Sequence, residues 1–86
     1  MENKKFTAWP LYTVEEADAV HEVVLSNKVN YWTGDECRKF EKKFSSWSES
    51  KYAVALGNGT QALDVALKAL DIGDGDEVIV TSRTFI

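Results

Sequence analysis

The amino-acid sequence predicts an α/β fold with a parallel sheet, and three segments of its C-terminal half carry that prediction. Tyr52–Leu56 (YAVAL) and Val78–Val80 (VIV) are short, continuous apolar runs of the kind that form buried strands. The segment between them, 60–70 (TQALDVALKAL), is rich in helix-forming residues. Apolar strands joined by a helix are typical of a parallel sheet covered on both faces. With two helices expected upstream, the predicted order is helix, helix, strand, helix, strand.

The first helix is predicted over about 14–26, after an irregular lead-in at 1–12 where Pro10 disfavours helix at the residue before it. Thr13 precedes the helix and Glu16 stands three residues later, which is the spacing of a reciprocal capping box. Apolar residues then recur at near-helical spacing as far as Leu25. The segment 27–35 (NKVNYWTGD) interrupts the pattern.

A second amphipathic helix is predicted after 27–35. Thr33 and Glu36 repeat the capping-box spacing, so Thr33 is expected to cap this helix. A narrow apolar stripe follows at positions i, i+3, i+7 and i+10, and charged residues occupy the other faces. The stripe consists of Cys37, Phe40, Phe44 and Trp47. For the third helix, over 60–70, Gly73 is the expected glycine just beyond the C-terminal cap.

The glycine turn 57–60 (GNGT) is the candidate binding site, because it lies between a predicted strand and a predicted helix. Small residues let backbone N–H groups approach a phosphate, and a helix N-terminus carries a partial positive charge. Gly57, Gly59 and Ala62 match the G-x-G-x-x-A form of a dinucleotide site, and Arg83 lies where it could receive the 2′-phosphate of NADP. A P-loop is excluded, because no Gly-Lys-Ser/Thr follows. A turn that binds nothing also fits the local pattern.

Composition excludes several classes of function. The 86 residues carry a net charge of −4 without a basic patch, which argues against a nucleic-acid or anionic-membrane partner. The N-terminus has no signal-peptide pattern and no apolar stretch is long enough to span a membrane, so we expect a cytoplasmic protein. The single histidine and single cysteine, His21 and Cys37, provide no metal-binding set.

From Tyr31 onward the chain resembles the N-terminal region of the DegT/DnrJ/StrS sugar aminotransferases, which use pyridoxal phosphate (PLP). Four ordered segments carry the resemblance: YWTGDECRKFEKKFSSW, YAVALGNGTQALDVALKAL, DIGDGDEVIV and TSRTFI. It implies the large domain of a fold type I PLP-dependent transferase, with an incomplete sheet because other strands separate the two predicted here. Residues 1–86 are therefore expected to be a single N-terminal fragment of a larger PLP-binding domain.

The resemblance also implies a site. The backbone N–H groups of Thr60 and Gln61, with Gly59 permitting close approach, would bind the PLP phosphate, and Phe85 would lie against the pyridine ring. Thr33 matches a segment near the sugar-nucleotide site. The family's cofactor-binding lysine and its carboxylate lie beyond residue 86, so no catalytic residue is expected in this chain and the fragment alone is predicted to be inactive.

The reaction that the resemblance implies for the full-length enzyme is transfer of an amino group from glutamate to a nucleotide-linked keto-sugar, in polysaccharide or sugar-nucleotide biosynthesis. A homodimer is implied as well. Two alternatives remain open from the residues themselves. One is an NADP-dependent oxidoreductase that uses the G-x-G-x-x-A turn. The other is a non-catalytic helical interaction module that uses the Phe40, Phe44 and Trp47 stripe.

Overall fold

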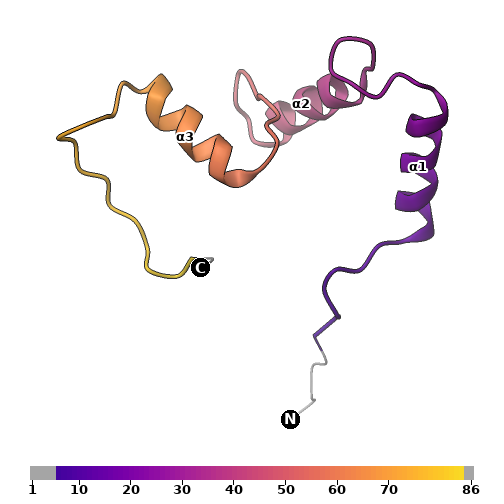
Figure 1. The fold of residues 1–86 in the computed structure, drawn as a ribbon, viewed down its shortest axis with the longest axis horizontal. Helices are drawn as coiled ribbons and strands as arrows, with labels where there is room; N and C mark the ends of the chain where they lie inside the picture. The colour runs from indigo at the N-terminus through magenta and orange to yellow at the C-terminus, as the bar shows by residue number, and fades with distance from the viewer. Residues whose placement is uncertain (1–5, 85–86) are drawn as a thin grey trace. The chain divides into compact units, whose positions relative to one another are not determined.

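The structure is a computed structural model, and it describes residues 6–84. Within these residues the chain forms α1 (Val14–Leu25), α2 (Glu36–Trp47) and α3 (Gly59–Ala69), which Figure 1 labels in chain order. The backbone divides into two units, 1–53 with α1 and α2, and 54–86 with α3. The three predicted helices are therefore present, each within one or two residues of its expected bounds, while residues 6–12 form no helix, as expected.

Helix α1 begins with the predicted capping box. The Glu16 amide donates to Thr13 Oγ1 at 3.2 Å, and the Thr13 amide donates to Glu16 Oε2 at 2.6 Å. Two of the N–H groups that a helix start leaves unpaired are satisfied in this way. The helix ends where Asn27 adopts a left-handed conformation with φ of 58°. Asparagine tolerates this conformation better than most residues, and its short polar side chain bonds to the Leu25 carbonyl.

The N-cap of helix α2 lies two residues after the predicted one. Asp35 is the N-cap residue, and its side chain makes no capping hydrogen bond. The predicted Thr33–Glu36 box is therefore wrong. The reason is local, because the amide and the hydroxyl of Thr33 both donate to the side-chain oxygen of Asn30. The threonine is thus part of the preceding loop rather than the helix cap.

Helix α3 begins after Asn58, whose side-chain oxygen accepts from the Gln61 amide at 2.9 Å. It ends at Ala69 with Leu70 as its C-cap, so the residue after the cap is Asp71, two positions before the predicted Gly73. Asp71 has a φ of 56°, its amide donates to the Lys68 carbonyl at 3.1 Å, and the Ile72 amide donates to the Leu67 carbonyl at 2.9 Å. These two bonds define a Schellman motif. The prediction of Gly73 as the residue after the cap is wrong, since Asp71 takes that role.

The two predicted strands are not formed in the described part of the chain. Tyr52–Leu56 and Val78–Val80 both have irregular backbone, outside any ladder. A strand exists only through hydrogen bonds to a neighbouring strand, and the resemblance implies other strands between these two. A helix satisfies its own backbone and forms without such neighbours. The parallel sheet therefore stays a prediction.

No side chain of residues 6–84 is buried. Helices α1 and α2 do not pack against each other. The stripe on α2 forms an aromatic row whose ring centroids lie 5.8 Å (Phe40–Phe44) and 5.4 Å (Phe44–Trp47) apart, and Trp47 is 79% exposed. Most helical stability in proteins comes from packing of an apolar face, and here that face is uncovered.

Candidate functional site

The first candidate site is the turn into α3. Asn58 has an extended backbone, with φ of −163° and ψ of 172°, and the chain enters the helix at Gly59. The Ala62 amide donates to the Asn58 carbonyl at 3.1 Å, which closes the first helical turn. Asn58 was not among the predicted site residues, although an asparagine directly before a helix is a well-known cap signal.

The turn leaves two amides available for an anion. The N–H groups of Gly59 and Thr60 precede the first intrahelical bond, and neither has a hydrogen-bond partner among residues 6–84. A Cβ on Gly59 would meet nothing within 4 Å, so the space beside these amides is open. The Gln61 amide is instead bonded to the Asn58 side chain. Of the three residues expected to hold a phosphate, Gly59 and Thr60 present free N–H groups, while Gln61 would have to exchange its partner.

The Gln61 side chain also shapes the turn. A Cβ on Gly57 would lie 2.7 Å from Gln61 Oε1, so the glutamine amide folds back over this glycine. The remaining predicted cofactor residue, Phe85, lies outside the described residues. Thr33 belongs to the unit 1–53 and Gly59–Gln61 to the unit 54–86, so they are described as two separate sites.

The second candidate site is the loop before α2, which contains Thr33. Asn30 Oδ1 accepts from three donors: the Trp32 amide at 3.0 Å, the Thr33 amide at 2.9 Å and the Thr33 hydroxyl at 3.0 Å. The Gly34 amide donates to the Asn30 carbonyl at 2.8 Å. One asparagine thus organises the following four residues. The Thr33 hydroxyl donates its hydrogen bond to Asn30, so its oxygen can still accept a hydrogen bond from a ligand.

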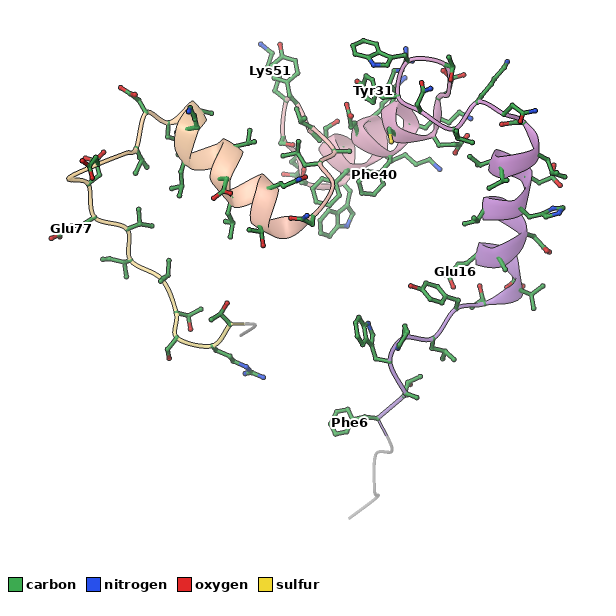
Figure 2. All side chains as sticks on the ribbon, in the orientation of Figure 1. Phe6, Glu16, Tyr31, Phe40, Lys51 and Glu77 are labelled. Carbon is green, nitrogen blue, oxygen red and sulfur yellow. The ribbon has the colours of Figure 1, made fainter. Side chains whose placement is uncertain are left out.

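Arg38, in the first turns of α2, holds the same loop from the other side. Its Nη2 atom donates to the Tyr31 carbonyl at 2.5 Å, to the Gly34 carbonyl at 3.1 Å and to the Trp32 carbonyl at 3.3 Å. Its guanidinium carbon lies 5.1 Å from the centre of the Tyr31 ring, within the range of a cation–π contact. Figure 2 labels Tyr31 on this loop, beside the start of α2.

The charged side chains elsewhere on α2 are solvated. Lys39 Nζ pairs with Glu36 Oε1 at 2.7 Å, one helical turn apart. The hydrogen bond that Lys39 donates to Glu36, together with the negative charge of Glu36, raises the pKa of Lys39 above its ordinary value. Among residues 6–84 no three histidine, cysteine or acidic side chains gather as a metal site would require. None of the helices in that range combines the length and apolarity needed to cross a bilayer.

Free N–H groups at a helix start, reached through a glycine turn, are backbone donors of the kind that can receive a phosphate. The chain belongs to the DegT/DnrJ/EryC1/StrS aminotransferase family, whose model matches residues 10–86. The family assignment confirms the resemblance carried by the four sequence segments.

Individual relatives agree with this assignment. Over 94% of its length the chain is similar to the X-ray structure of the aminotransferase from Psychrobacter cryohalolentis, with 69% identity and a TM-score of 0.85. It is 43% identical over 75 residues (87% of the chain) to dTDP-3-amino-3,6-dideoxy-alpha-D-galactopyranose transaminase from Aneurinibacillus thermoaerophilus. It is 37% identical over 82 residues (95% of the chain) to 3-amino-5-hydroxybenzoate synthase from Amycolatopsis mediterranei. The chain spans about a fifth of each of these proteins, 20%, 20% and 21% respectively.

Proposed function

We propose that this chain is the N-terminal segment of a PLP-dependent aminotransferase that converts a nucleotide-linked keto-sugar to an amino sugar, with glutamate as the amino donor. The observation that carries the proposal is the turn into α3, where Gly59 and Thr60 present unpaired N–H groups in a chain of an aminotransferase family. The nucleotide-sugar substrate is supported by the relative named for a dTDP-linked amino sugar. A homodimer and a cytoplasmic location complete the proposal.

The described residues fit the phosphate of PLP. Two free amides point from a helix start, the glycine leaves open space, and the helix dipole favours the dianion. Gly59 and Thr60 would donate directly. Gln61 would join them when Asn58 releases its amide, and Phe85 would lie against the ring. When bound, PLP supplies the electron sink that stabilises negative charge at the reacting carbon.

The chain's own residues then bind and orient rather than transfer protons. The turn into α3 anchors the cofactor by its phosphate. Thr33 would accept a hydrogen bond from the substrate, since its proton is already donated to Asn30. The lysine and carboxylate that the chemistry needs are proposed to belong to the rest of the protein, so residues 1–86 alone would be inactive.

The reaction is tested with the complete gene product, PLP, glutamate and a panel of nucleotide-linked keto-sugars. Each turnover converts one glutamate to 2-oxoglutarate and one keto-sugar to its amino sugar, so both products must form in equal amounts. Formation of both supports the proposal. Turnover of a non-sugar ketone alone would overturn the substrate class, and NADPH-dependent reduction without 2-oxoglutarate would overturn the reaction class.

The phosphate site is tested by two substitutions at one position. Gly59→Pro removes one N–H at the first helical residue, where proline is tolerated and where the extended Asn58 suits a following proline. We expect PLP to bind about 10- to 100-fold more weakly, since a hydrogen bond to a charged group contributes roughly 1.5–3 kcal/mol. Gly59→Ala keeps the N–H and measures how closely the phosphate approaches. Unchanged PLP affinity in Gly59→Pro would contradict the role of this amide.

A further inference from the structure

Two side chains, those of Asn30 and Arg38, bond to the backbone of the loop before α2. Arg38 reaches back over four to seven residues to three of its carbonyl groups. Carbonyl oxygens in an irregular loop have no partner within the loop itself and would otherwise bond to water. A single guanidinium therefore replaces water on one side of residues 31–34.

The aromatic contact fixes the position of the guanidinium. Arg38 lies over the Tyr31 ring, and the Tyr31 hydroxyl lies 3.5 Å from Glu41 Oε2 on the next turn of α2. The ring is thus placed between the arginine and the helix that carries it. Trp32 meets the Tyr31 ring edge to face, with centroids 5.8 Å apart and planes at 86°.

Asn30 closes the loop from the opposite side, where its oxygen accepts from Trp32 and Thr33. Gly34 permits this closure, because a Cβ there would lie 2.3 Å from the Lys28 carbonyl oxygen. The result is a loop whose backbone donors face Asn30 and whose carbonyl groups face Arg38. The Thr33 oxygen and the Trp32 indole, which is 85% exposed, are left for other contacts.

We propose that Arg38 is a positioning residue for the sugar half of the reaction, because it holds residues 31–34 in the conformation that presents Thr33 and Trp32 to the nucleotide-sugar. This inference rests on the proposed function. Arg38 acts through the loop, since its Nη2 donates to the loop carbonyl groups. Arg38 orders the loop before the substrate binds, so the binding free energy is not reduced by the cost of ordering the loop.

Arginine is required for this role rather than any cation. The planar guanidinium lies over the Tyr31 ring while its Nη2 donates to the loop carbonyl groups, whereas lysine is a compact point charge on a flexible stem. Arg38→Lys keeps the charge and most of the length but not the planar group that lies over Tyr31. We expect it to restore only part of what Arg38→Ala loses.

The complete gene product is tested as Arg38→Ala, Arg38→Lys and Lys39→Ala. The last is the matched control, because it removes a cation from the same helix that pairs only with Glu36 in the described structure. We expect Arg38→Ala to raise the KM for the nucleotide-sugar about tenfold, with kcat changed by less than about twofold, as for loss of uniform binding. The KM for glutamate should not change, because the donor reacts in a separate half-reaction.

A second readout is independent of activity. Hydrogen exchange of the Trp32 and Thr33 amides should be faster in Arg38→Ala than in the wild type, and unchanged in Lys39→Ala. An unchanged nucleotide-sugar KM in an active Arg38→Ala enzyme would overturn the inference, and so would unchanged exchange of these amides. An equal rise in the KM for glutamate would also overturn it, because it would indicate general disruption. A wild-type protein that aminates no nucleotide-sugar would instead refute the proposed function.

Discussion

Gly34 is the position at which the loop before α2 has least room for an added atom. A Cβ there would lie 2.3 Å from the Lys28 carbonyl oxygen and 3.0 Å from the Asn30 carbonyl oxygen, and real Cβ atoms essentially never come closer than 3.0 Å. Both neighbours are backbone atoms, so no side chain can rotate to relieve the clash. Gly34 is not among the residues with positive φ, and the requirement is therefore for space alone. We predict that Gly34→Ala opens the loop.

The size of the effect follows from the bonds that must move. Separating residue 34 from residue 28 stretches the 2.8 Å bond from the Gly34 amide to the Asn30 carbonyl and the 3.1 Å bond from Arg38 to the Gly34 carbonyl. A neutral hydrogen bond contributes about 1 kcal/mol and one to a charged group about 1.5–3 kcal/mol, while overpacking strain is about 1–3 kcal/mol. We expect a local destabilisation of about 2–4 kcal/mol.

Amide hydrogen exchange at Thr33 in the complete gene product measures this effect, because that amide donates to Asn30 within the loop. Each 1.4 kcal/mol is a factor of ten, so exchange should become about 30- to 700-fold faster, or reach the unprotected rate. Gly73→Ala is the control, since a Cβ there meets nothing within 4 Å and the Gly73 N–H that donates to Asp76 is kept. Exchange at Thr33 within twofold of wild type in Gly34→Ala would refute the steric argument.

Three further predictions concern the caps and the loop. Asn30→Asp should leave exchange of the loop amides nearly unchanged because it keeps the accepting oxygen, whereas Asn30→Ala should accelerate it about tenfold through loss of three bonds; equal effects of the two would show that the oxygen is not the organising group. Thr13→Ala should destabilise the first turn of α1 by about 1 kcal/mol, seen as faster exchange at Glu16, while Thr13→Ser should not. Asp71→Gly should slow exchange in the last turn of α3, because glycine has no steric penalty at a φ of 56° and the negative charge at the helix C-terminus is removed; faster exchange there would contradict this reasoning.

The helices were predictable from sequence because the signals that form them are local. The Thr13–Glu16 box and the periodic apolar residues of α1 lie within a few positions of one another, and the structure confirms both. The same spacing at Thr33–Glu36 led to a wrong prediction of a capping box, because the threonine amide and hydroxyl donate to Asn30 instead. A capping pattern cannot show whether its threonine is already bonded elsewhere.

For the candidate sites, too, the sequence predicted one part and only the structure showed the other. The turn into α3 was predicted, since a glycine turn before a helix leaves amides free whatever surrounds it. The structure alone shows that the Gln61 amide already donates to the Asn58 side chain. No sequence motif indicated the loop held by Arg38. The contacts of Arg38 reach backbone carbonyl groups up to seven residues away, and every residue type has such a carbonyl group.

By itself, the sequence determined the three helices, the aminotransferase family and the position of the glycine turn before α3, because each depends on short-range patterns. The tertiary structure decided which residue caps α2, which residue ends α3 and how Arg38 and Asn30 close the loop between them. These depend on competition between groups for the same hydrogen bonds, which spacing does not resolve. The two apolar runs predicted as strands illustrate the remaining physical difference: a helix pairs its own backbone, whereas a strand is formed only by its neighbours.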